Sequence, residues 1–384
     1  MLAVLLSGSA WADPEDTLNL LVSTSMTQDD NLFRASDSAL LGPTQSRSEM
    51  IQTTGLGFKI DKRYSLQRFL FESTATDYSF KNNRYLDYVG KNVNANWQWS
   101  LTPRLHGNLS STYNESQASF TDYGGGIGKN VRTVETERFD AEWEAMGPWR
   151  LTAGVSRNDT KNAQTIAVDN SSTTESMDWG LRYVAASGSF LALVLRNSDG
   201  RYSSPVNLVS KQNSPFHLNE TELRYTWLPT GKSRLSGRIA QVDRKYQDYS
   251  ERDYQGVVGN IDWTYGVTGQ WTLVLGWQRA LSPYTSTDAS YYISEGYNVM
   301  PVWQITAKTS MRLRYAHETR SYRGALTTPL RAEERMNQSM LAFDWAALRT
   351  LTLSASYQRQ TRNTARTGGD FASNMSMITA NLAF

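Results

Sequence analysis

The chain has 384 residues, with 39 Lys and Arg against 37 Asp and Glu, and it contains no Cys. Its 39% of apolar residues, to which 26 glycines add, is ordinary for a folded protein and argues against intrinsic disorder. The net charge of +2 gives no reason to expect nucleic acid as a partner. The lack of cysteine excludes disulfides, thiolate metal sites and a catalytic thiol, and no run approaches the ~20 apolar residues of a membrane helix.

The first twelve residues resemble the end of a secretory signal peptide. Residues 2–6 are apolar, and Ala10 and Ala12 flank Trp11 in the small-x-small pattern of a signal-peptidase site. The alternative is a frayed N-terminus. We expect residues 1–12 to be a signal remnant and residues 13–384 to form one domain outside the cytoplasm.

From there on, apolar and polar residues alternate almost continuously, and a period of two indicates strands. Tight turns recur about every 40 residues, a spacing typical of a repeated supersecondary unit. We place these turns near Lys62, Thr102, Gly147, Ser187, Thr230, Thr268, Lys308 and Leu348.

Eight turns join sixteen strands, and one strand before the first turn (residues 17–26) and one after the last (residues 374–384) make eighteen. Longer polar segments lie between the hairpins, at residues 28–47, 115–134, 199–216 and 320–334. Short turns at one end and long loops at the other are typical of an outer-membrane barrel. The sequence therefore predicts an all-β, transmembrane, antiparallel up-and-down barrel of about 18 strands, with short periplasmic turns and longer extracellular loops.

Two other all-β folds share part of this pattern. A β-propeller repeats at a similar spacing, but each blade needs four short strands where this chain has two long runs. A soluble sandwich also alternates, but its core would scatter tryptophans along the strands. Nine tryptophans instead lie close to the predicted short turns, as a membrane-interface girdle requires: Trp97, Trp99, Trp143, Trp149, Trp227, Trp263, Trp271, Trp303 and Trp345.

The opposite set of alternating positions is rich in charge and is predicted to line the pore. Between residues 138 and 144, for example, Phe139, Ala141 and Trp143 alternate with charged residues. Two interpretations stay open: these residues contact a hydrated solute, or they pair across strands and brace the barrel. The candidates are Arg138, Asp140, Glu142, Glu144, Asp178, Arg182, Glu220, Glu222, Arg224, Arg238, Asp262, Arg312, Arg314 and Asp344.

Tyrosines gather in the predicted long-loop regions, where they suit either an outer aromatic girdle or a path on which sugar rings stack. They are Tyr78, Tyr85, Tyr88, Tyr246, Tyr249, Tyr254, Tyr284, Tyr291, Tyr292 and Tyr297.

Enzymatic function has little support in the sequence. The three histidines, His106, His217 and His317, fall on separate strands or loop edges, with no Ser or Asp signature nearby. Hydrolase, nucleotide-binding and zinc-peptidase motifs are missing from the sequence. We expect no catalytic residues, no metal and no cofactor.

Several blocks resemble the EpsL-type family of exopolysaccharide-operon outer-membrane proteins. They are residues 17–33 (TLNLL, then DDNLF), 97–110 (WQWSLTPRLHGNLS), 135–143 (ETERFDAEW) and 301–315 (PVWQITAKTSMRLRY). The resemblance implies an integral outer-membrane barrel that serves secretion of an exopolysaccharide made by a Wzx/Wzy-type pathway. It also implies a periplasmic polysaccharide-export protein as partner, and it carries over no catalytic residues.

The favoured hypothesis is thus a barrel that conducts an exopolysaccharide chain across the outer membrane, in contact with outer-membrane lipid. A last strand that alternates and ends at Phe384 resembles the signal read by the barrel-assembly machinery. A general or small-solute diffusion porin is the alternative, and an outer-membrane hydrolase is a remote second alternative.

Overall fold

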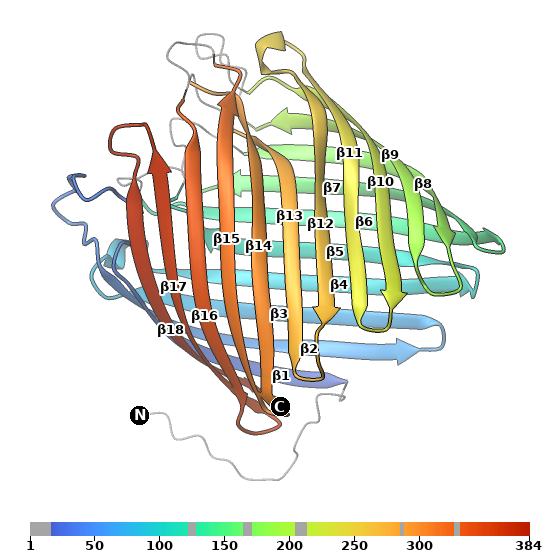
Figure 1. The fold of residues 1–384 in the computed structure, drawn as a ribbon, viewed down its shortest axis with the longest axis horizontal. Helices are drawn as coiled ribbons and strands as arrows, with labels where there is room; N and C mark the ends of the chain where they lie inside the picture. Colours follow the sequence, from blue (N-terminus) through green and yellow to red (C-terminus); the bar gives the residue numbers. More distant parts are fainter. Residues whose placement is uncertain (1–16, 122–127, 164–170, 204–212, 285–287, 326–330) are drawn as a thin grey trace.

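A computed structural model describes residues 17–121, 128–163, 171–203, 213–284, 288–325 and 331–384. The predicted signal remnant, residues 1–12, lies outside the described residues. Eighteen antiparallel strands form one closed sheet (Figure 1). The strands are β1 (Leu18–Asp29), β2 (Glu49–Tyr64), β3 (Gln67–Phe80), β4 (Tyr88–Thr102), β5 (Leu105–Gln117), β6 (Val131–Met146), β7 (Trp149–Asn162), β8 (Ser172–Val184), β9 (Phe190–Tyr202), β10 (Phe216–Thr230), β11 (Ser233–Tyr246), β12 (Tyr254–Gly266), β13 (Trp271–Pro283), β14 (Tyr291–Thr306), β15 (Thr309–Arg323), β16 (Glu334–Ala346), β17 (Leu351–Thr364) and β18 (Phe371–Ala383).

The predicted barrel and its eight short turns are confirmed. Each strand pairs with its neighbours in the chain, from β1–β2 to β17–β18. The first turn falls at Ser65 and Leu66, slightly after the predicted position. Ser65 and Gly147 adopt positive φ angles (53° and 56°) in these tight turns, a conformation that lets the chain reverse over few residues. The long connections lie at the other end of the barrel (Figure 1).

Pairing between β1 and β18 closes the sheet. Their register runs from Leu21 opposite Ala383 to Asp29 opposite Met375. Beyond it, the backbone of Leu20 exchanges hydrogen bonds with Phe384 in both directions. Closure gives every strand a neighbour on both sides through which it can satisfy most of its backbone groups, as a bilayer requires.

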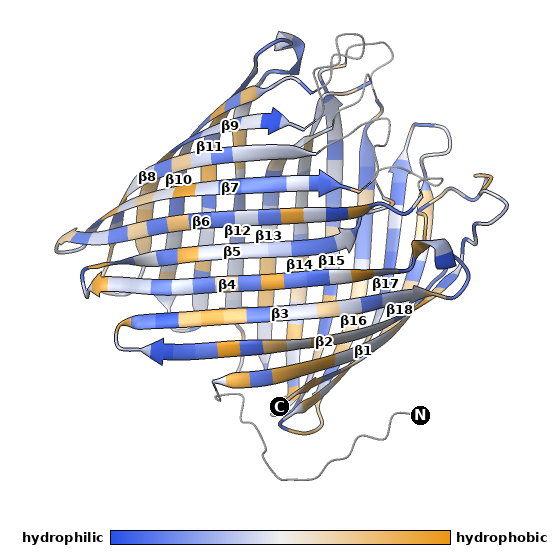
Figure 2. Ribbon diagram, turned by 180° about the vertical axis from the view of Figure 1, so that it is seen from behind, coloured by the Kyte–Doolittle hydropathy of each residue, from blue (hydrophilic) through white to orange (hydrophobic). Residues whose placement is uncertain are grey.

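Alternation along each strand gives the barrel two different faces. Outward side chains such as Leu109, Phe139 and Val155 are 45–49% exposed, and they lie side by side on β5, β6 and β7. The residues between them are polar and face the lumen. Figure 2 shows this alternation as bands of opposite hydropathy along the strands. The strands cross the barrel wall with an apolar outside and a polar inside, as a membrane barrel needs.

Helical structure is minor. Two single-turn 3-10 helices, η1 (Arg84–Leu86) and η2 (Ser250–Arg252), lie in long connections. Within the described ranges, no helix has the length and apolar content needed to span a bilayer.

Candidate functional site

The lumen wall carries all fourteen of the predicted pore-lining residues at inward-facing positions. They come from seven strands: β6, β8, β10, β11, β12, β15 and β16. The register shows why they share a face. Arg138 lies opposite Ser110 and Ser156, while the outward Phe139 lies opposite Leu109 and Val155.

Ion pairs connect these residues from β6 to β9. Arg138 makes two contacts with the Asp178 carboxylate, at 2.7 and 3.1 Å, and its Nε lies 3.6 Å from Asp140. Arg196 Nε lies 3.8 Å from Asp178 Oδ1, the oxygen that Arg138 also contacts at 2.7 Å, and Arg196 lies 3.1 Å from Glu220. Asp178 is therefore shared by two guanidinium groups, which offsets the cost of its burial at 5% exposure.

The same network continues through β10 and β11. Glu222 is 1% exposed, and it accepts hydrogen bonds from Arg224 and Arg238, both at 2.7 Å. Arg238 also lies 2.9 Å from Glu220. These contacts form one continuous chain of alternating charge, named here the ion-pair network: Arg138, Asp140, Asp178, Arg196, Glu220, Glu222, Arg224 and Arg238.

A second group of charges lies closer to the short-turn end. Glu142 is 2.6 Å from Arg182 and 3.4 Å from Arg150, and Arg150 also contacts Glu144. Sequence reasoning missed Arg150 and Arg196, although both occupy inward positions in their strands. Arg196 follows Ala192 and Val194, which are also inward-facing, so apolar residues on both faces of β9 hid the alternation there.

The remaining predicted residues are less connected. Arg312 pairs with Asp344 at 2.8 Å across β15 and β16. Asp262 accepts a hydrogen bond from Asn260 at 2.7 Å. Arg314, next to Arg312 on the same face, has no ion pair with any residue of the described part of the chain. Bracing across strands therefore accounts for most of the predicted set, though not for Arg314, nor for Asp262, whose contact with Asn260 lies within β12.

A different part of the lumen is lined by uncharged polar side chains. Strands β17, β1, β4 and β5 place amides and hydroxyls at successive inward positions in their middle sections, and β18 adds Thr379 and Asn381 next to the inward-facing Met375 and Met377. This surface is named here the neutral wall: Ser23, Ser25, Thr27, Asn92, Asn94, Asn96, Gln98, Asn108, Ser110, Thr112, Ser354, Ser356, Gln358, Gln360, Thr379 and Asn381.

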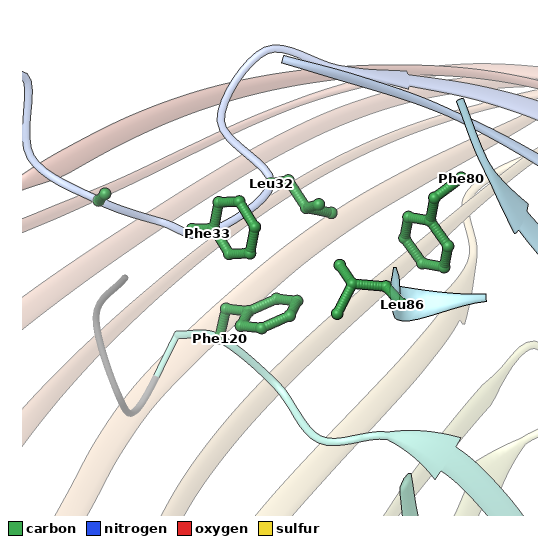
Figure 3. Packing of buried hydrophobic residues seen from close by; sticks show 6 residues of the cluster. Leu32, Phe33, Phe80, Leu86 and Phe120 are labelled. Atoms are coloured by element: carbon green, nitrogen blue, oxygen red, sulfur yellow. The ribbon is translucent and has the colours of Figure 1, made fainter. Parts of the chain in front are cut away.

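Three long connections pack together at the mouth of the barrel. Leu32 and Phe33 come from the β1–β2 connection, Leu86 from the β3–β4 connection and Phe120 from the β5–β6 connection. Figure 3 shows these side chains and Phe80 converging on one small apolar core. The rings of Phe33 and Phe120 meet edge to face, 5.0 Å apart. Their burial, with Phe33 and Leu86 fully covered, holds the three connections as one unit.

This loop unit also reaches strands that are distant along the sheet. Arg362 on β17 faces the lumen and donates to the backbone oxygen of Thr121, which follows β5. Five strands separate β17 from β5 around the wall. Arg34 similarly contacts Gln360 at 3.3 Å while it pairs with Asp29 at 2.7 Å. Because Arg362 and Gln360 point inward, the described parts of these loops extend across the opening of the lumen.

The nine predicted girdle tryptophans occupy outward-facing positions near the short-turn end. Trp143, Trp227 and Trp345 are 45–56% exposed on the barrel exterior. Trp99 is the buried member, because it stacks on Phe139 and covers Gly107. Their contact with a membrane interface stays a prediction.

The tyrosines and histidines do not form a single site. Tyr78 and Tyr88 stack face to face on the inner wall, whereas Tyr297 is outward-facing. His106 faces the lumen near Glu142, while His217 and His317 lie on the outside of β10 and β15. In the described residues, no group of three or more His, Asp or Glu is placed to hold a metal ion. The expectation that the chain is not an enzyme remains a prediction.

Comparison with solved structures identifies the same architecture. No protein-family profile matches the chain, and no curated protein matches it. The crystal structure of OccK2 (OpdF) of Pseudomonas aeruginosa has a TM-score of 0.54 and 12% identity, covering 96% of this chain and 98% of that one. The outer membrane protein OpdK of the same organism gives 0.53 and 11%, covering 96% and 99%. OpdK crystallised with vanillate gives 0.53 and 12%, covering 97% and 100%.

These similarities show the fold, and the closed sheet with its apolar outer face is that of a membrane-spanning barrel. The chain is an integral outer-membrane β-barrel with porin-like architecture. Its short turns lie on the periplasmic side and its long loops on the extracellular side, as the loop asymmetry of such barrels dictates.

Proposed function

We propose that this protein is a passive outer-membrane channel for neutral, polyhydroxylated solutes, that is, for saccharides. Barrels of 16–18 strands in the porin class enclose an aqueous channel. The observation that carries the proposal is the neutral wall, where amides and hydroxyls donate and accept hydrogen bonds without charge. Such groups can replace water molecules in the hydration shell of a sugar, and they bind the sugar weakly enough that it still passes through the channel.

The ion-pair network supports the same proposal because its charges are already compensated. Glu222 and Glu220 each contact arginines on neighbouring strands, and Asp178 is shared between Arg138 and Arg196. Paired charges create a weaker field in the lumen than a stripe of one sign would. A channel built to attract ions would leave more of these charges unpaired.

The loop unit at the mouth favours solutes of limited size. Phe33 and Phe120 pack together, and Arg362 on β17 holds the β5–β6 connection through the Thr121 oxygen. With these contacts in place, the opening is narrower than the barrel itself. Mono- and oligosaccharides are therefore the solutes that the described geometry favours, and this is the porin alternative in a specific form.

Secretion of an exopolysaccharide is the second candidate, and the length of the neutral wall favours it. The wall runs along the middle of β17, β1, β4 and β5, so an extended glycan would meet amides and hydroxyls along most of its path. Strands β2 and β3, between its two parts, carry the inward-facing Lys59 and Glu72. This candidate agrees with the EpsL-type resemblance and requires the loop unit to move aside. It also requires a periplasmic export protein to deliver the polymer and assembly machinery to recognise the strand that ends at Phe384; both partners are part of the proposal.

Flux measurements in proteoliposomes test the main proposal. We expect neutral sugars to enter with a sharp size limit, and we expect Asn94→Leu with Asn96→Leu to lower sucrose flux about tenfold. Leucines at the outward-facing Ser73 and Ser111 serve as the matched control and should leave flux unchanged. Liposomes that stay impermeable to every neutral sugar would overturn the proposal.

A gene deletion separates the two candidates. Loss of exopolysaccharide from the medium, together with retained uptake of small sugars, would favour the secretion channel. Unchanged polymer secretion with reduced sugar uptake would eliminate it and favour the diffusion channel.

A further inference from the structure

The sheet contains a seam between β12 and β13 at its extracellular end. The two strands pair only from Gly259 opposite Arg279 to Gly266 opposite Thr272. Above this point β12 continues to pair with β11 as far as Tyr254, and β13 continues to pair with β14. Residues 254–258 and residues 280–282 are therefore both in strands, yet they do not pair with each other.

The strands overlap where the pairing stops. Ala240 and Val242 lie on the same face of β11 as Arg238, which belongs to the lumen network. Ile293 shares the face of β14 that carries the outward Tyr297. Nevertheless, Ala240, Val242, Tyr254 and Val258 are buried against Leu281, Tyr291 and Ile293. The inner face of β11–β12 thus covers the outer face of β13–β14. At this end of the barrel, β13–β14 therefore lies on the lumen side of β11–β12.

Side chains, rather than backbone hydrogen bonds, hold this overlap closed. The rings of Tyr254 and Tyr291 lie 5.4 Å apart, and Ala240 is completely buried between the two layers. The Val257 oxygen, just beyond the last ladder pair, accepts from Arg279 Nε at 3.1 Å. Separating the two layers would expose apolar surface but would break no strand-to-strand ladder. Apolar contact costs little to open when acyl chains replace it, because lipid chains are as apolar as the residues they cover.

A recess on the outer wall begins at the same place. Its volume is about 410 Å³, and its lining includes Arg279 and Ile293 from the seam. Trp277 and Tyr297 supply aromatic surface, whereas Arg323 and Glu295 supply charge of both signs. Aromatic surface beside paired charges suits an amphiphile with an acyl chain and a zwitterionic headgroup.

We propose that this seam is a lateral port between the lumen and the outer leaflet, and that the recess is the entry site for a single-chain zwitterionic amphiphile. The headgroup rests on the charged rim of the recess while the acyl chain inserts between Tyr254 and Tyr291. This activity goes beyond conduction of saccharides along the barrel axis, and each can exist without the other.

Photocrosslinking in proteoliposomes tests the port. The probe is lysophosphatidylcholine with a benzophenone on its acyl chain, and mass spectrometry locates the labelled peptides. We expect labels on lumen-facing residues of β11 and β12 in the unmodified protein. Bridging Tyr254→Cys to Tyr291→Cys with a reductant-cleavable bismaleimide should reduce this labelling at least tenfold, and reductant should restore it. The chain has no native cysteine, so the bridge is specific.

Matched variants serve as controls for the crosslinking experiment. Phe343→Cys with Ala355→Cys places the same reagent across β16 and β17, where pairing is continuous, and should change nothing. Val242→Asn weakens the overlap without a bridge and should raise lumen labelling severalfold. Sucrose flux through the bridged protein reports separately on the axial channel and on folding. Absence of lumen labelling, or equal labelling with and without the bridge, would overturn the port.

Discussion

Gly154 shows how a single residue makes room for the ion-pair network. It lies on β7 directly opposite Asp140, between the strands that carry Arg138 and Asp178. A Cβ at this position would lie 2.4 Å from Arg138 Nη2 and 3.2 Å from Asp178 Oδ2. The glycine is therefore required by the ion pair that crosses above it, and not by backbone conformation.

Gly154→Val should displace Arg138 and leave Asp178 short of one partner. Overpacking of this kind typically costs about 1–3 kcal/mol of folding stability. The ion pair that is weakened belongs to Asp178, a carboxylate that is 5% exposed. We expect a lower urea midpoint for unfolding of the barrel from lipid vesicles, followed by tryptophan fluorescence. Gly231→Val is the control, because nothing lies within 4 Å of the corresponding Cβ in its turn. Equal midpoints for the two variants would contradict this account of Gly154.

At the scale of the elements, the loop unit is fastened to the wall by few polar contacts. Arg362 is 4% exposed, donates to the Gly369 oxygen at 2.6 Å and to Thr121, and lies 3.8 Å from Glu334. Its guanidinium thus links the β17–β18 connection to the β5–β6 connection. Because Phe120 packs against Phe33, the β1–β2 connection is restrained together with the β5–β6 connection.

Arg362→Ala should release the loop unit and widen the mouth. We expect a higher single-channel conductance in planar bilayers and a larger size limit for neutral sugars, because the restraint on residue 121 is lost. Arg359→Ala is the matched control: Arg359 lies on the same strand, faces outward and contacts only Asn374 among the described residues. Conductance that is the same in all three proteins would show that the loop unit does not limit passage.

These elements mark where sequence reasoning succeeded and where it stopped. Short turns and the inward or outward direction of each side chain follow from a period of two, which is a local property. The contact between Arg362 and Thr121 joins positions 241 residues apart, and no local pattern encodes it. The seam was equally invisible, because β12 and β13 each alternate normally and differ from other neighbours only in how far they pair.

For the whole molecule, the arrangement of charge sets how the lumen treats ions. The net charge of +2 says little by itself, since the charged side chains of the lumen are concentrated in compensated groups. Glu222 is the most buried carboxylate of the ion-pair network, and two arginines donate to it. Removing its charge leaves Arg224 without a carboxylate partner among the described residues, and it leaves Arg238 with Glu220 alone.

Glu222→Gln should therefore make the channel prefer anions. We expect the reversal potential in a KCl gradient to shift toward the chloride potential, with a severalfold change in the permeability ratio. The shift should shrink at high salt, because the screening length falls from ~10 Å at 0.1 M to ~3 Å at 1 M. Glu175→Gln removes the same charge from an exposed, outward-facing position and should have no effect. If both variants shift the potential equally, selectivity arises at the surface of the protein, and the ion-pair network serves only to brace the wall.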